Sequence, residues 1–173
     1  KHFTLSEFTR SYAAQINGIK NEPSESQIRN IECLCALILD PLQECLGHPI
    51  YITSGFRTQR LNRIVGGSTT SAHMEGLAAD FKVGDKEYLL DWAWCLLKSI
   101  NHPYRKHIDQ CIYYRNKGFI HVALSKEGNQ GVYIDRIKGG GGTPARRFAA
   151  GYACGAPHGW PAKDGKGRQR APK

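Results

Sequence analysis

One ten-residue segment constrains this chain more than any other: Ser71-Ala-His-Met-Glu-Gly-Leu-Ala-Ala-Asp80. A histidine and an aspartate seven residues apart would stand two turns apart on a helix. Gly76 interrupts such a helix, however, and residues 79–83 have the composition of a β-strand. The segment therefore predicts a loop entering a strand, in which His73 lies back beside Asp80. One nitrogen and one oxygen ligand form a pair that zinc accepts.

His121 is the natural third ligand, although it lies in the apolar run of residues 119–124. A lone histidine in such a strand is more often a core residue than a metal ligand. The upstream pair of His73 and Asp80 changes that balance, because two histidines and a carboxylate leave the fourth tetrahedral position of zinc to water.

The remaining pattern indicates a mixture of helices and strands. Ser24 and Gln27 read as a capping box for a helix that extends to about residue 45, and Asp85 can cap another that extends to about residue 100. Strand-like runs cover residues 49–53, 79–83, 109–114, 119–124 and 131–134, with a hairpin turn signal at 115–118. We expect an α+β fold, a small antiparallel sheet with helices packed on one side and the zinc site at the sheet.

The ten-residue segment resembles a family signature. It matches, position for position, the pattern SxHxxGxAxD of the zinc D-Ala-D-Ala carboxypeptidase family, which includes phage L-alanyl-D-glutamate endolysins. Tyr51-Ile-Thr-Ser-Gly-Phe-Arg-Thr58 resembles the family's strand ending in SG(Y/F)R, and residues 118–124 resemble the strand that carries the second zinc histidine. Residues 3–9 and 38–43 also look like members from phages and mobile elements. The resemblance covers about residues 3–125 and implies the fold of Hedgehog-type metallopeptidases.

The resemblance also implies roles for single residues. His73, Asp80 and His121 match the three zinc ligands, which implies one Zn²⁺ per chain. Arg57 matches an arginine over the metal that stabilises the substrate carbonyl or its oxyanion, a role suited to a fixed guanidinium. Ser71 matches a position that orients the loop, and we assign it to the substrate-binding part of the site.

The general base departs from the family pattern. Many members place a carboxylate three residues before the second zinc histidine, where this chain has Gly118. In another branch the preceding strand reads DQLIxE, and Tyr114 stands here at the position of its glutamate. Asp109, Glu75, His107 and Tyr114 are the candidates by chain proximity. Tyr114, across the expected hairpin from His121, is favoured as a hydrogen-bond donor rather than as a base.

Charge is divided unevenly along the chain. Residues 1–135 hold 15 Lys and Arg against 14 Asp and Glu, whereas residues 136–173 hold nine against one. Four glycines from Gly139 open a segment rich in Gly, Pro and basic residues. We therefore expect a zinc peptidase domain at 1–137 and a disordered basic tail at 138–173, which binds polyanions without specificity rather than reading a DNA sequence.

The six cysteines do not form a metal site of their own. They stand at positions 33, 35, 45, 95, 111 and 154, and none belongs to a CxxC pair, which excludes zinc ribbons and fingers. Those at 33, 35, 45 and 95 fall in apolar helical stretches, so we expect buried free thiols.

These observations predict a single-zinc peptidase that hydrolyses peptidoglycan stem peptides, as a D-Ala-D-Ala-type carboxypeptidase or an endolysin-like endopeptidase. The alternative is a catalytically degenerate zinc-binding module that binds cell wall or serves as a virion or mobile-element component. No apolar run is long enough to span a membrane and no signal peptide is visible. We expect a monomer made in the cytoplasm and acting on the cell wall through phage lysis, a virion or export.

Overall fold

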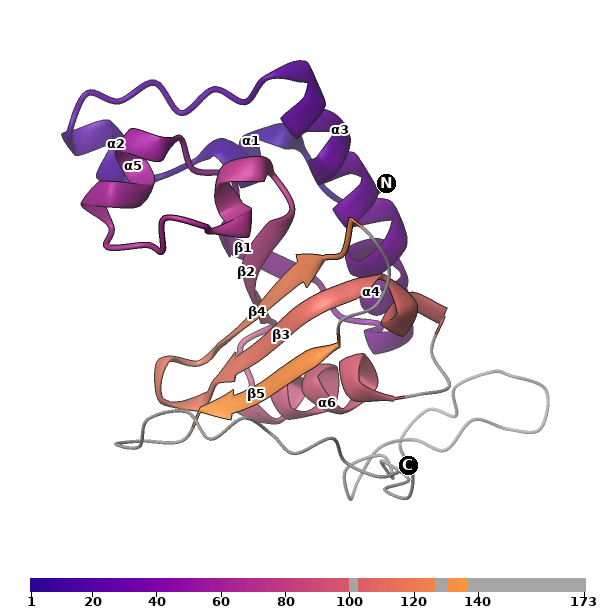
Figure 1. Ribbon diagram of the computed structural model, residues 1–173. Helices are drawn as coiled ribbons and strands as arrows, with labels where there is room; N and C mark the ends of the chain where they lie inside the picture. The colour runs from indigo at the N-terminus through magenta and orange to yellow at the C-terminus, as the bar shows by residue number, and fades with distance from the viewer. Residues whose placement is uncertain (100–102, 127–130, 137–173) are drawn as a thin grey trace, which may run out of the picture.

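A five-stranded mixed sheet organises the residues that the computed structural model describes, 1–99, 103–126 and 131–136 (Figure 1). In spatial order its strands are β1 (Ile50–Ser54), β2 (Ala78–Val83), β4 (Phe119–Leu124), β3 (Ile108–Tyr114) and β5 (Val132–Arg136). The first four are antiparallel to their neighbours, and β5 lies parallel to β3. The predicted α+β class is confirmed.

The wholly antiparallel sheet expected from the sequence is wrong at β5. This strand reverses the direction of β4, as the next strand of a meander would. Both sides of β4 are already occupied by β2 and β3, however, so β5 pairs with the open side of β3, to which it is parallel. Alternation of apolar residues assigns a strand's faces but not its neighbours, which is why the sequence did not reveal this pairing.

Six α-helices accompany the described strands: α1 (Leu5–Thr9), α2 (Tyr12–Ile16), α3 (Glu25–Leu34), α4 (Asp40–Leu46), α5 (Gln59–Ile64) and α6 (Glu87–Lys98). The capping box at α3 is confirmed, because Ser24 and Gln27 each accept a hydrogen bond from the other's backbone N–H. A π-helical turn at Cys35–Leu39 joins α3 to α4 just before Pro41, which lacks the N–H of a regular helix. The expected cap at Asp85 is wrong, since α6 follows Lys86 without a side-chain cap.

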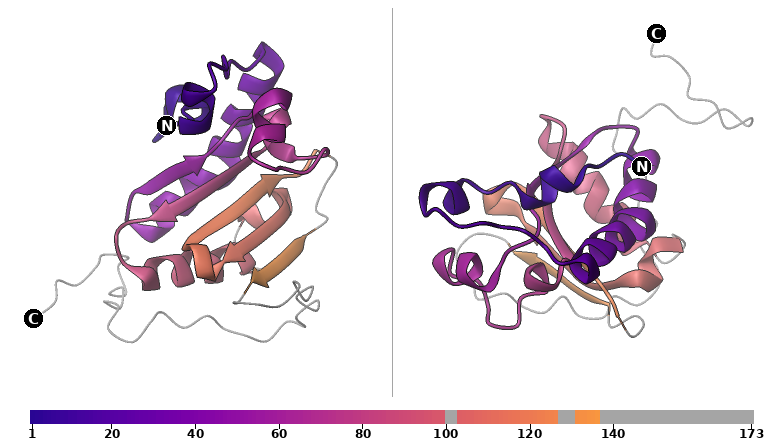
Figure 2. Two further views of the ribbon diagram at one scale, coloured as in Figure 1. Left: turned by 90° about the vertical axis from the view of Figure 1, so that its left-hand side faces the viewer. Right: turned by 90° about the horizontal axis from the view of Figure 1, so that it is seen from above.

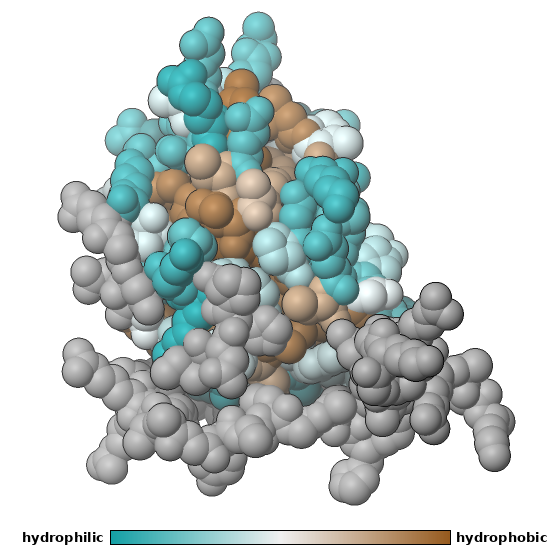
Figure 3. All heavy atoms as spheres, turned by 90° about the vertical axis from the view of Figure 1, so that its right-hand side faces the viewer, coloured by the Kyte–Doolittle hydropathy of each residue, from teal (hydrophilic) through white to brown (hydrophobic). Residues whose placement is uncertain are grey.

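The core lies between the sheet and helices α3, α4 and α6, which cover one face (Figure 2). Alternate strand residues point into it, among them Phe81 in β2, Val122 in β4 and Tyr113 in β3. On the side over α3 and α4, apolar residues show between hydrophilic ones (Figure 3). Helices α2 and α5 pack against each other beyond one end of the sheet. The other alternate positions of β2, β3 and β4, including Asp80 and His121, therefore face away from these helices.

The expectation of buried thiols holds for only part of the set. Cys35 and Cys111 are buried, and burial raises the pKa of Cys35 to about 12. Cys95 is half-buried, and the expectation is wrong for Cys33 and Cys45, which are exposed. They lie in apolar-looking stretches but off the helix stripe that contacts the sheet. Cys154 lies outside the described residues.

No helix in the described part of the chain combines the length and apolar character that a membrane span requires. The predicted basic tail at 138–173 lies outside the described residues.

Candidate metal centre

Asp80 and His121 meet on two adjacent interior strands of the sheet. Asp80 of β2 stands directly opposite His121 of β4 in the antiparallel register, so both side chains project from the same face. The Oδ1 atom of Asp80 lies 2.7 Å from Nδ1 of His121. This pair extends from the face opposite the helices, where a ligand can reach it.

His73 reaches the pair from a 3₁₀ helix, Ala72–Glu75, that precedes β2. The helix ends at Gly76, whose φ of 71° reverses the chain, and a Cβ there would lie 2.6 Å from the Gln27 carbonyl oxygen. Both observations require glycine. The reversal places Nε2 of His73 3.2 Å from Nδ1 of His121 and 3.3 Å from Oδ1 of Asp80.

The orientation of the His73 ring is fixed from behind. Its Nδ1 lies 2.7 Å from the carbonyl oxygen of Gly55, which can only accept, so Nδ1 carries a proton and donates it. Nε2 therefore presents its lone pair to the cluster. Metal-binding histidines commonly have such a second hydrogen bond, which sets the tautomer and holds the ring.

The three side chains have the composition of a zinc site. One donor atom from each of His73, Asp80 and His121 lies within 4.8 Å of the others, and no other such group occurs among the described residues. Two imidazole nitrogens and one carboxylate oxygen suit zinc with an open coordination position. The donor set and the fixed His73 tautomer thus fit a single zinc ion.

The electrostatics of the cluster favour metal binding. Burial alone would raise the pKa of Asp80, but its contacts with the His121 and His73 rings hold it well below its usual range. Burial lowers the pKa of His73, and the Arg57 and His121 charges lower it further, outweighing the attraction of Asp80. Asp80 is therefore a carboxylate and His73 a neutral imidazole near neutral pH, the forms that bind metal.

Arg57 lies beside the cluster and is held at three points. Its Nη2 lies 3.4 Å from Oδ2 of Asp80, Nη1 donates to Oδ1 of Asn62 and Nε donates to Oγ of Ser54. Its side chain is 14% exposed, so the guanidinium is partly desolvated. Burial lowers its pKa, although the Asp80 charge opposes that shift. A fixed, half-buried cation beside the metal ligands is suited to stabilising negative charge on a bound molecule.

Gly55 sets the distance between the arginine segment and the first helix. A Cβ at this position would lie 2.5 Å from the Phe8 backbone, so only glycine lets the end of β1 approach α1 this closely. The same residue accepts the hydrogen bond from His73, and the backbone N–H of Arg57 donates to the His73 carbonyl. Gly55 thus positions both sides of the site.

Tyr114 lies on the same face as the cluster. Ile112 pairs with His121, and Tyr114 is two residues farther along β3, so its side chain projects from the face that carries His121. Its ring stacks on Phe119 with 4.7 Å between the centroids, and its hydroxyl is close enough to Arg57 to influence that guanidinium's pKa. It can therefore supply a hydroxyl at the border of the site.

The other candidate bases lie apart from the cluster. Asp109 stands at an irregularity of β3, three residues before Ile112, or about 10 Å along the strand. His107 precedes β3 at the same end. Glu75 is exposed, with its carboxylate 3.6 Å from the Lys126 amine. None belongs to the metal-ligating group found among the described residues.

Ser71 is the residue before the 3₁₀ helix, and no side-chain hydrogen bond caps that helix. Its carbonyl accepts from the Met74 N–H and its own N–H donates to Ser68, so it shapes the loop through its backbone.

Sequence reasoning missed Asn62. This residue is 3% exposed, and its side chain accepts from Arg57 and donates to the Ser68 carbonyl, joining α5 to the loop before His73. A polar side chain on a short helix gives no signal in the sequence here, because its partners Arg57 and Ser68 stand five and six residues away, outside the three- and four-residue spacings that pair side chains on a helix.

Comparison with protein-family models gives a match to a peptidase family. The family model described as Peptidase M15 matches residues 1–123, which include the four residues His73, Asp80, His121 and Arg57. No curated protein matches the chain.

Proposed function

Because the chain belongs to the peptidase M15 family, we propose that it is a zinc-dependent peptidase that hydrolyses the stem peptides of bacterial peptidoglycan. The observation that carries this proposal is the convergence of His73, Asp80 and His121 on one point, with Arg57 3.4 Å from Asp80. The substrate class rests on the likeness of residues 71–80 to the D-Ala-D-Ala carboxypeptidase signature. Both a carboxypeptidase and an L-alanyl-D-glutamate endopeptidase fit this assignment.

Different side chains of the site would have different roles in hydrolysis. His73, Asp80 and His121 would hold the metal, and Gly55 keeps His73 in the tautomer that can bind it. Zinc, when bound, supplies a Lewis acid for the scissile carbonyl and lowers the pKa of water. Arg57 is placed to stabilise the negative charge that develops on the carbonyl oxygen, and Ser54 and Asn62 keep its guanidinium in place.

Hydrogen bonding to the substrate and acceptance of the proton fall to residues outside the metal ligands. We propose Tyr114 as the group that hydrogen-bonds the substrate, because it shares the face of His121 and lies near Arg57. Asp109 remains a candidate base only if the substrate or a water chain bridges the roughly 10 Å along β3. We place Ser71 on the substrate side of the loop, where its backbone shapes the approach to His73.

A specific observation favours the second candidate function, a zinc-binding module without turnover. The two positions at which relatives carry a carboxylate are Gly118 and Tyr114 here. Within the described residues Asp80 is the one carboxylate of the cluster, and it is committed to the metal and to Arg57. Such a module would bind cell wall or form part of a virion or mobile element.

Purified full-length protein with zinc should release free amino groups from peptidoglycan, and a chelator should abolish the release until zinc is restored. Walls of several chemical types are needed, because the scissile bond is unassigned. Inactivity on every wall, with zinc still bound, would favour the binding module.

In that case Tyr114→Glu, which restores a carboxylate on the same face as His121, should create activity where the wild type has none.

We further propose that the chain is a monomer of phage or mobile-element origin, made in the cytoplasm, that reaches the wall at lysis, within a virion or by export. Residues 1–137 form the peptidase domain and residues 138–173 a basic extension. The M15 match ends at residue 123, which supports a domain boundary between that residue and the basic extension.

A chain ending at Lys138 should keep its fold and zinc content but bind polyanions less strongly. The removed residues 139–173 hold seven Lys and Arg against one Asp, so loose electrostatic attraction to polyanions should depend on them and weaken with salt. Circular dichroism, metal analysis and retention on a polyanionic resin at increasing salt measure the three properties. Unfolding of the shortened chain would mean that Phe148 or Trp160 belongs to the core.

A further inference from the structure

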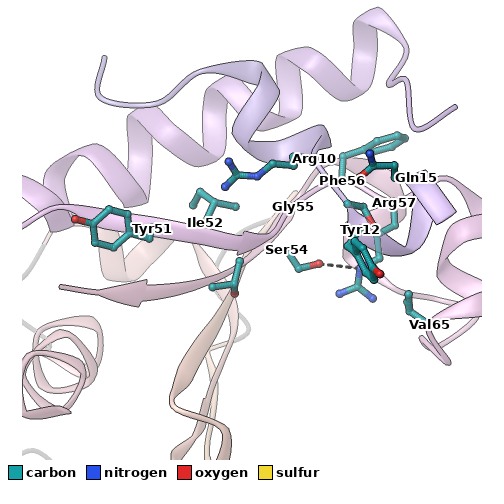
Figure 4. Close-up of a pocket in the computed structure, with 12 residues that line it drawn as sticks. Arg10, Tyr12, Gln15, Tyr51, Ile52, Ser54, Gly55, Phe56, Arg57 and Val65 are labelled. Atoms are coloured by element: carbon teal, nitrogen blue, oxygen red, sulfur yellow. Dashed lines mark hydrogen bonds between the residues drawn. The ribbon is translucent and has the colours of Figure 1, made fainter. Parts of the chain in front are cut away.

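A pocket of about 820 Å³ lies along β1, the edge strand of the sheet, and ends at Arg57. It follows the chain from Tyr51 in β1 to Arg57, and the segment from Arg10 to Tyr12 forms its other wall (Figure 4). Arg57 belongs both to this pocket and to the surroundings of the cluster. The volume is that of a small-molecule or short-peptide site, and a ligand bound in it would lie next to Arg57, the neighbour of Asp80.

The lining of the pocket has two uncommon properties. Among the described residues that line it, two are arginines and none is Asp or Glu. Tyr12, Tyr51 and Val65, all lining residues, are also large apolar side chains exposed by 77%, 53% and 45%. Exposed aromatic surface around a positively charged hollow is typical of a ligand site rather than of a surface that only faces water.

Arg10 is the cation of this pocket that the metal centre does not use. Arg57 is paired with Asp80, whereas Arg10 is exposed and has no ion-pair partner among residues 1–99, 103–126 and 131–136. Figure 4 shows its side chain over β1, between Tyr51 at one end and Arg57 at the other. An acidic group lying there would meet the only cation of the pocket whose charge is not already balanced by the protein.

The backbone beneath Arg10 is held in a fixed relation to Arg57. Arg10 is the C-cap residue of α1, where its N–H donates to the Ser6 carbonyl, and the Ser11 hydroxyl caps α2 by accepting from the Ala14 N–H. The buried side chain of Asn21 donates to the carbonyls of Thr9 and Phe56 and accepts from the Thr58 N–H. One amide therefore joins the residue before Arg10 to the residues on both sides of Arg57, so the two walls of the pocket are preorganised.

We propose that this pocket is a substrate subsite for an acidic peptide, in which Arg10 pairs with a side-chain carboxylate of the peptide while Tyr12 and Tyr51 contact its backbone and apolar atoms. The subsite deepens the proposed peptidase function and rests on it for its role in catalysis. Binding of an acidic peptide in the pocket does not depend on peptidase activity, because the pocket residues alone provide the contacts. It implies that the enzyme prefers stem peptides with a free carboxylate next to the scissile bond over those in which that group is amidated.

The test compares two N-terminally fluorescent, C-terminally amidated dipeptides, L-alanyl-D-glutamate and L-alanyl-D-glutamine, which differ in one carboxylate. Anisotropy is measured with the full chain in chelator, so that no peptide is cut. Wild type should bind the glutamate peptide at least about fivefold more tightly, and the preference should shrink as salt rises. Arg10→Gln should reduce it to less than about twofold and Arg10→Glu should reverse it. Arg29→Gln, an exposed arginine of α3 outside the pocket, should keep it.

Equal binding of the two peptides by wild type, binding of neither, or a preference that survives Arg10→Gln would each overturn the subsite. Failure of the peptidase function has a different signature. If the protein shows the Arg10-dependent preference but does not cut peptidoglycan in the presence of zinc, the subsite is supported and the peptidase function is refuted. If it cuts peptidoglycan but shows no Arg10-dependent preference, the peptidase function is supported and the subsite is refuted.

Discussion

His73→Ala and Asp80→Ala proteins should purify without tightly bound zinc, whereas the wild type should hold one zinc ion per chain. Each substitution removes one of the three converging donor atoms, and two remaining ligands rarely hold zinc against a chelator. Asp80→Asn is the sharper variant, because it keeps the volume of the side chain and removes the charge that pairs with Arg57. Metal analysis after dialysis against a weak chelator measures the stoichiometry.

Asp109, near the start of β3, and His107, just before that strand, provide matched controls. His107→Ala and Asp109→Ala remove the same functional groups from positions outside the cluster, so both should retain one zinc. Circular dichroism of every variant separates loss of metal from loss of fold. A wild type that neither contains nor takes up zinc would refute the metal centre, as would Asp80→Asn protein with an unchanged zinc affinity.

The part of this site that could be predicted is the part encoded by local pattern. A hairpin signal at residues 115–118 and alternating apolar residues place His121 on a strand, and Gly76 followed by a strand brings His73 back toward Asp80. These are short-range rules, since each depends on neighbours in the chain. The register that sets Asp80 opposite His121 follows from the same alternation once β2 and β4 are adjacent.

The unpredicted part depends on contacts between distant residues. Gly55 must be glycine because of the Phe8 backbone, 47 positions upstream, and Asn21 is buried because it joins Thr9 to Phe56 and Thr58. No sequence pattern around these residues identifies the residues that they contact in the fold. The same limit explains β5, whose neighbour was decided by the occupied edges of β4 rather than by its own composition.

Arg57→Ala should lower turnover on peptidoglycan by about 100-fold or more while zinc stays bound, as removal of a donor that stabilises a developing oxyanion does elsewhere. Arg57→Lys should rescue only part of the loss. The guanidinium contacts Ser54, Asn62 and Asp80 through three different nitrogens, and a single ammonium on a flexible stem cannot reproduce that arrangement. Arg60→Ala, an exposed arginine on α5, is the matched control and should retain activity.

The ion pair with Asp80 sets the conditions under which this prediction is measured. Loss of the Arg57 charge removes a partner of a metal ligand, so zinc affinity can change together with turnover. Release of amino groups is therefore followed at saturating zinc, and bound metal is determined in the same samples. A large fall in turnover at full zinc occupancy then assigns Arg57 to the transition state. If activity survives Arg57→Ala at full zinc occupancy, the protein is still a peptidase but Arg57 does not have this catalytic role. If wild type and variant are equally inactive on every wall, the binding module is favoured, because a protein without turnover has no transition state for Arg57 to stabilise.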